Sequence, residues 1–324
     1  MKLPQGVNIK KGEKNMAQPA NTGCLKGAII IALVVVIALV AGVLIVINLT
    51  PADVGLADVE LFDGETLATL GLADVKFKDF PKMLKEILEP PSESEIVLKP
   101  VDKVAEKATA TENIGESSVQ KKEDGSIDYS SIITDKIVYP TKKNIEYKDT
   151  TLAYIFNQMV NDGAESNEDA IKYLQDLNAN IDEVSIANTA EGFVLRVVAS
   201  IDLGTMTAEL NDALEEAGVS SFIKIPEKAY IVSYQTIAIG EDGLTYTSKS
   251  LKINDSDNAL TRAIMKILAK KANEAAQEAG ENIDTSENVV NDKIGEAFVT
   301  VVTNLGKPVS LEDGAIIVET YTAE

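Results

Sequence analysis

The feature that most constrains this chain is an uninterrupted apolar run at residues 27–49, which contains no charged side chain. As a helix that rises 1.5 Å per residue, this run is about 34 Å long, enough to cross a hydrocarbon core of about 30 Å. The run is rich in Val and Ile, as buried strands are, but strands usually end after four to eight residues. We therefore predict a single transmembrane helix at residues 27–49.

The distribution of charge predicts how the chain is oriented across the membrane. Residues 1–26, the expected cytoplasmic tail, carry five Lys and one Glu, a net charge of +4, whereas the rest has 25 basic and 50 acidic residues. Because basic residues next to a span stay in the cytoplasm, residues 50–324 are expected outside the plasma membrane. A cleaved signal peptide is the alternative, but the run exceeds the usual h-region and lacks an Ala-x-Ala site.

Missing residue types exclude several kinds of function. The chain has no histidine, which excludes Ser-His-Asp and Cys-His catalysis and histidine-liganded zinc sites. Its single cysteine, Cys24, lies before the apolar run, so no disulfide supports the outer portion. The acidic balance after the span disfavours nucleic acid as a partner, because phosphate binding depends on clustered Lys and Arg. We expect no metal, no cofactor, no catalytic residue and no enzymatic activity. An enzyme that uses carboxylate, Lys or Tyr chemistry is the third of three hypotheses for the function.

The region between the span and the main domain is expected to divide into two parts. Residues 50–98 form a juxtamembrane segment with a short repeat, in which residues 55–59 recur at 71–75, and a helix is predicted at 80–88. Residues 99–128 are dominated by Lys, Glu, Ser, Thr and Asp. Such a composition buries too little apolar surface to offset the ordering entropy, so we expect a flexible linker or an excursion from the domain.

Residues 129–324 are predicted to form one extracytoplasmic α+β domain. Alternating apolar and polar residues predict a strand at 193–203, with Arg196 opposite Leu195, and a hairpin of strands at 229–239 and 244–253. Apolar residues at helical spacing predict two long amphipathic helices at 257–279 and 286–305. The expected architecture is an antiparallel sheet, flat or curved, packed on these two C-terminal helices.

A curved sheet wrapped on helices can leave an apolar groove between the two layers. Mostly apolar concavities are the usual sites for small ligands. Apolar side chains from one face of the predicted strands and helices are the candidate lining: Leu195, Val197, Ile201, Ile231, Ile237, Ile264, Phe298 and Val301. The alternative is direct packing of the helices on the sheet, with no groove.

The chain resembles a known group of proteins in two short sequence motifs, at residues 148–158 and 291–295, and in the order of the elements between them. Over about residues 131–307 it resembles a group of uncharacterised single-span membrane proteins of Gram-positive bacteria. Their outer domain is similar to the tubular lipid-binding superfamily. The resemblance implies a half-tube whose interior takes acyl chains, and it brings no catalytic residues.

The sequence therefore favours a membrane-anchored extracytoplasmic binding protein that holds a lipid or another apolar ligand in the groove. Burial of acyl methylenes, about 0.8 kcal/mol each, would drive this binding. A structural or assembly subunit of a cell-envelope complex, with protein partners and no small-molecule ligand, is the alternative.

Overall fold

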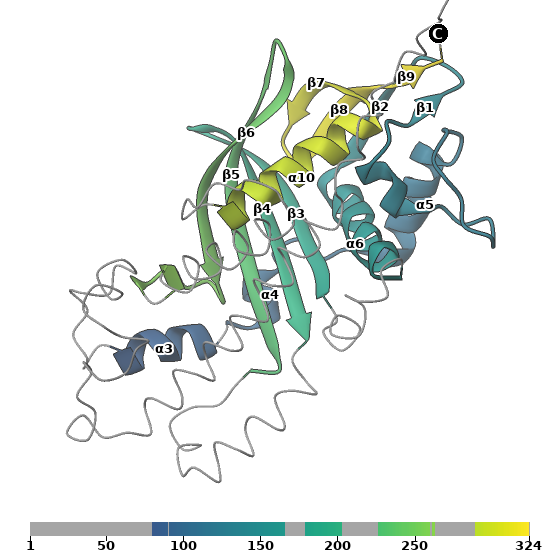
Figure 1. The fold of residues 1–324 in the computed structure, drawn as a ribbon. Helices are drawn as coiled ribbons and strands as arrows, with labels where there is room; N and C mark the ends of the chain where they lie inside the picture. Colours follow the sequence, from purple (N-terminus) through teal and green to yellow (C-terminus); the bar gives the residue numbers. More distant parts are fainter. Residues whose placement is uncertain are drawn as a thin grey trace, which may run out of the picture.

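The computed structural model describes residues 80–89, 91–165, 179–202, 226–259, 261–262 and 289–323. Within these ranges the chain is α+β, and its largest sheet is antiparallel, as predicted (Figure 1). No described helix has the length and apolarity needed to cross a membrane. The tail at 1–26, the expected anchor at 27–49, the repeat at 55–75 and most of the expected helix at 257–279 lie outside the described residues.

The main sheet has the strand order β3-β4-β5-β6, and each neighbouring pair is antiparallel. β3 (Ala179–Thr189) and β4 (Gly192–Asp202) form one hairpin, and β5 (Lys228–Gly240) and β6 (Gly243–Ile253) form the next. The second hairpin confirms the one expected from the alternating pattern. Its turn requires glycine because Gly243 has a φ of 113°, which side chains with a Cβ rarely adopt.

One face of the main sheet, called here the inner face, packs on helices α6 (Asp149–Glu165) and α10 (Val289–Leu305). α10 confirms the last predicted helix, and it crosses in front of the sheet in Figure 1. The rings of Phe156 on α6 and Phe298 on α10 stack, with 5.9 Å between their centroids. These two helices and the inner face form the main hydrophobic core.

A second, smaller antiparallel sheet has the order β2-β8-β7. It consists of β2 (Asn144–Lys148), β7 (Lys307–Glu312) and β8 (Ala315–Glu319). Beside it, β1 (Val138–Tyr139) and β9 (Tyr321–Thr322) pair in parallel. The buried Tyr139 and Tyr147 hydroxyls share a hydrogen bond of 3.1 Å, and burial raises the pKa of Tyr139 to about 12.

Residues 99–128 differ from the expected linker or excursion, because they contain helix α5 (Lys103–Ile114) and contribute to the core. The Asp102 carboxylate caps this helix by accepting hydrogen bonds from the Val104 and Ala105 amides, at 3.0 and 3.1 Å. Ala110 and Ile114 are fully buried on one side of α5. A narrow stripe of small and branched apolar side chains supplies burial that overall composition does not reveal. The 3₁₀ helix η2 (Tyr129–Ile133) follows and packs on α6.

The opposite, outer face of the main sheet is covered by residues 92–99, called here the strap. The strap begins with the single-turn helix α4 (Glu93–Ile96), and α3 (Phe80–Leu88) precedes it in the sequence as predicted. Ile96 and Val97 pack with Val198, Tyr230 and Val232 in a separate small cluster. α4 and α10 therefore lie on opposite faces of the sheet (Figure 1).

Candidate functional site

The structure brings five of the eight candidate groove residues into the main core cluster, and each is at most 8% exposed: Leu195, Val197, Ile237, Phe298 and Val301. Ile201 and Ile231 are also buried but are not members of that cluster. They lie toward the ends of β4 and β5 that are distant from the β5–β6 turn. Ile264 lies outside the described residues.

In its N-terminal half, α10 packs directly on the sheet. A Cβ atom at Gly295 would be 2.3 Å from Cδ2 of Tyr246 and 2.6 Å from Oε1 of Gln235. Glycine at this position therefore lets the helix backbone approach β5 and β6 more closely than any other residue would. At this contact the helix and the sheet leave no room for an acyl chain between them.

Three buried polar side chains, Ser233, Gln235 and Asn291, lie beside this contact and are called here the polar belt. Ser233 Oγ donates a hydrogen bond to Asn291 Oδ1 at 2.5 Å, and Gln235 Nε2 donates to the Asn291 carbonyl oxygen at 2.8 Å. β6 has a bulge at this level, because Ser250 pairs with Tyr234 and Ser248 with Gln235, which leaves Lys249 unpaired in the register. Because buried polar groups are costly unless they are hydrogen-bonded, the polar belt fixes the start of α10 against β5.

Beyond the polar belt, toward the end of the sheet distant from the β5–β6 turn, the inner face is apolar again. The register places Ile201 opposite Ala229, and Ile231 between Ala199 and Ile253. Residues directly opposite one another in a sheet point to the same face. They form a contiguous group, called here the strand-end patch: Ala199, Ile201, Ala229, Ile231 and Ile253. It includes the two described candidates that lie outside the main cluster.

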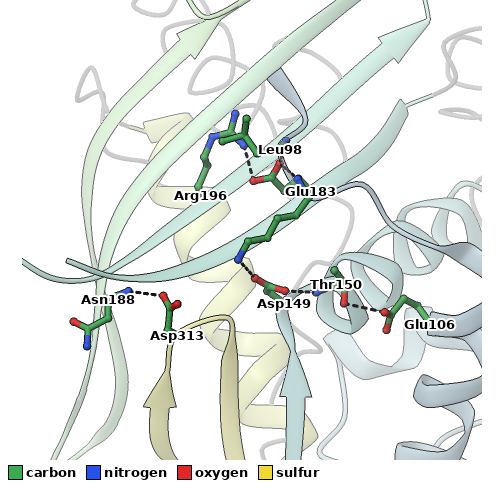
Figure 2. A network of polar contacts seen from close by, with 9 residues as sticks. Leu98, Glu106, Asp149, Thr150, Glu183, Asn188, Arg196 and Asp313 are labelled. Atoms are coloured by element: carbon green, nitrogen blue, oxygen red, sulfur yellow. Dashed lines mark hydrogen bonds and ion pairs between the residues drawn. The ribbon is translucent and has the colours of Figure 1, made fainter. Parts of the chain in front are cut away.

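On the outer face, Glu183 and Arg196 form a buried ion pair (Figure 2). Arg196 Nη1 donates to Glu183 Oε1 at 2.6 Å, and the Glu183 side chain has no exposed surface. Glu183 Oε2 accepts hydrogen bonds from the amides of Leu98 and Lys99, at 2.5 and 3.0 Å. Arg196 also donates to the Ile96 carbonyl oxygen. The ion pair thus binds the main chain of the strap at three points.

A second set of polar contacts connects the strap to helices α5 and α6. Lys99 Nζ lies 2.7 Å from Asp149 Oδ2, and Asp149 Oδ1 accepts a hydrogen bond from the Thr150 amide. The Thr150 hydroxyl donates to Glu106 on α5 at 2.9 Å (Figure 2). The strap is therefore held at its C-terminal end as well as by the ion pair.

Sequence reasoning placed Arg196 on the face opposite Leu195, and the β4–β5 register confirms this. It did not single out Glu183 or the strap. The available signal was an Arg and a Glu within strand-like stretches, since an unpaired charge is rarely tolerated in a buried sheet. The pairing of Arg196 with Glu183 could not be predicted without the register of the strands.

Among the residues that the structure describes, no group of three or more Asp, Glu or Cys side chains is arranged to hold a metal ion. No family model, no curated protein and no solved structure matches the chain. Its function is therefore inferred from geometry.

Proposed function

We propose that this chain is a membrane-anchored extracytoplasmic binding protein that holds a lipid acyl chain, or another apolar ligand, against the strand-end patch. The supporting observation is the division of the inner face. α10 contacts the sheet directly at Gly295, whereas the strand-end patch lies beyond the polar belt. Ile201, Ile231 and Ile264 are the proposed ligand contacts, and the other five candidates form the main core beside them. Ile201 and Ile231 are only 2% and 4% exposed, so binding requires the patch to open.

The physical chemistry of the two regions favours this division. Each buried acyl methylene contributes about 0.8 kcal/mol, and the patch offers only Ala and Ile side chains. The polar belt satisfies much of its own hydrogen bonding and gains nothing from contact with a hydrocarbon chain. An anchor at residues 27–49 would hold the domain beside the outer leaflet, which supplies lipids.

Photo-crosslinking in cells tests this function on the full chain. Cells are fed a diazirine-bearing fatty acid that enters their phospholipids, and after irradiation the purified chain is digested with trypsin. We expect lipid adducts on the peptides of residues 197–224 and 229–249, which carry most of the patch. Adducts on the predicted anchor serve as the internal positive control. Adducts confined to the anchor would contradict the proposal.

A matched pair of variants assigns any adduct to the patch. Ala199→Phe adds a large side chain among the patch residues, and Thr247→Phe adds the same side chain at an exposed position of β6. We expect Ala199→Phe to reduce the adducts on these two peptides several-fold. Thr247→Phe should leave them unchanged, and neither variant should alter the anchor adducts.

A structural or assembly subunit of an envelope complex is the second candidate, favoured by the direct packing at Gly295 and by the strap on the other face. In both places the chain's own residues cover the surface of the sheet. Protein cross-linking in cells that captured a specific neighbour, together with lipid adducts only on the anchor, would favour this candidate.

A further inference from the structure

We propose that the outer face of the main sheet carries a peptide-binding site, built around Glu183 and Arg196, for which the strap is the resident ligand. The site takes a peptide that has two adjacent branched apolar residues at the end of a helical turn, followed by two free backbone amides. It lies on the face opposite the strand-end patch and does not depend on the proposed lipid function.

The site recognises main-chain groups at three positions. Glu183 Oε2 accepts from two consecutive amides, those of Leu98 and Lys99, and Arg196 donates to the carbonyl of Ile96. Hydrogen bonds to the main chain provide affinity that does not depend on the ligand's side chains. A proline at position 98 or 99 would remove one of the amide donors.

Side chains of the strap provide the selectivity. Ile96 and Val97 are buried against Val198 and Val232 of the sheet, whereas the next residue, Leu98, is 63% exposed. Two apolar side chains therefore enter the outer face, and the third points away from it. The apolar contact of the strap with the sheet is therefore confined to one short stretch, as for a short bound peptide.

The sheet holds the recognition groups in place. Glu183 comes from β3 and Arg196 from β4, and Arg196 Nε donates to the Tyr234 hydroxyl on β5 at 3.2 Å. The guanidinium carbon of Arg196 also lies 5.8 Å from the centroid of the Tyr234 ring. Because three adjacent strands fix these groups, the site keeps its geometry when the strap leaves, and a second peptide can use it.

The strap is delimited in the sequence as a separable segment. Pro91 precedes it and Pro100 follows it, and its only helix has four residues. Its outer ion pairs, Glu93 with Lys228 at 3.2 Å and Lys99 with Asp149 at 2.7 Å, each include a side chain well exposed to water. The Glu93–Lys228 pair is exposed and contributes little, so the contacts with Glu183, Arg196 and the apolar floor hold the strap, together with the Lys99–Asp149 pair at its C-terminal end.

Peptide binding in trans tests the proposal on the full chain in phosphatidylcholine nanodiscs. The double substitution Ile96→Asp and Val97→Asp unseats the strap but keeps the site on the sheet. A fluorescent peptide of residues 91–102 should bind this chain at least tenfold more tightly, by anisotropy, than it binds the chain with an intact strap. Lack of binding to the unseated chain, with its circular dichroism unchanged, would overturn the proposal.

Two controls identify the recognition groups. In the unseated chain, Arg196→Met should weaken peptide binding at least tenfold, whereas Lys252→Met, which removes another cation near the Tyr234 ring, should not change it. A peptide N-methylated at the residues corresponding to Leu98 and Lys99 lacks both donors to Glu183, and it should also bind at least tenfold more weakly. Equal binding of the N-methylated peptide would overturn the proposed recognition.

Hydrogen exchange tests the opening of the strap in the unmodified chain, so no substitution perturbs the result. A separable ligand opens without unfolding the sheet, so the Leu98 and Lys99 amides should exchange at least tenfold faster than the amides of Val198 and Val232. Equal protection of the strap and the strands would show that the strap opens only with the whole sheet, and it would overturn the proposal.

Discussion

The two faces of the main sheet are covered in physically different ways. On the inner face, α6 and α10 bury side chains such as Leu195, Phe298 and Val301 in an apolar core. On the outer face, a strap of eight residues is held through a buried ion pair and main-chain hydrogen bonds. Apolar packing stabilises the fold, whereas a buried ion pair loses most of its attraction to desolvation and chiefly specifies position. The comparison indicates that apolar packing on the inner face stabilises the sheet, whereas polar contacts on the outer face position the strap.

Removing the cation of the outer face should have the largest effect on stability. Arg196→Met leaves the fully buried Glu183 carboxylate without its partner, and removing one member of such a pair costs about 3–5 kcal/mol. Urea unfolding of the full chain in detergent measures the loss. Lys252→Met is the control, because the ion pair of Lys252 with Asp255 is partly exposed and is expected to contribute less than about 1 kcal/mol.

The double variant Glu183→Met, Arg196→Met sharpens the same comparison. It removes both charges, so it should be more stable than Arg196→Met alone, although the strap amides lose their acceptor. A double variant less stable than Arg196→Met would show that the hydrogen bonds from the strap amides to Glu183 outweigh the cost of its unpaired charge.

On the inner face, Gly295 tests the direct packing of α10 on the sheet. Gly295→Ala places a Cβ atom against Tyr246 and Gln235, and overpacking of this kind costs about 1–3 kcal/mol. A contact of 2.3 Å favours the upper end of this range, about 3 kcal/mol, and the higher helix propensity of Ala returns about 1 kcal/mol, so a net loss of about 2 kcal/mol is expected in the same urea unfolding. Gly240→Ala is the matched control, since its Cβ would have no neighbour closer than 3.9 Å. Equal stability of the two variants would contradict direct packing at α10.

The inner face could largely be predicted from the sequence, because its side chains follow the periods of strands and helices. The face of β4 that carries Leu195, the β5–β6 hairpin and α10 all follow from these periods. Gly295 belongs to one of the two motifs that carry the resemblance. Its close approach to the sheet could not be predicted, because it depends on the positions of Tyr246 on β6 and Gln235 on β5. The expected second helix at 257–279 and Ile264 stay predictions.

The outer face could not be predicted in the same way, because its contacts join residues far apart in the chain. Glu183 accepts hydrogen bonds from amides 84 and 85 residues earlier. Its position relative to Arg196 also depends on a bulge between Ile181 and Glu183, for which the sequence has no glycine. α5 was hidden for another reason, since its buried stripe consists of small residues within a polar composition.

The smallest expected effect concerns Asp182, the residue at the β3 bulge beside the strap. Burial raises the pKa of the Asp182 carboxyl; Ser200, Lys228 and Lys103 oppose this rise, and Glu93 adds to it. The folded state therefore binds the proton more tightly than the unfolded state does, so this group makes the fold less stable as the pH rises above about 3.9, the ordinary pKa of Asp. Asp182→Asn removes that loss.

Asp182→Asn should therefore stabilise the chain at pH 7, by less than about 1 kcal/mol because the residue is only partly buried. At pH 3 both states of the original chain carry a protonated Asp182, so the difference between the two chains should vanish. Urea unfolding at both pH values gives the comparison. If the variant is less stable at pH 7, the attraction between Asp182 and Lys228 outweighs the desolvation of the carboxylate. Charges on the outer face would then stabilise the fold in addition to positioning the strap.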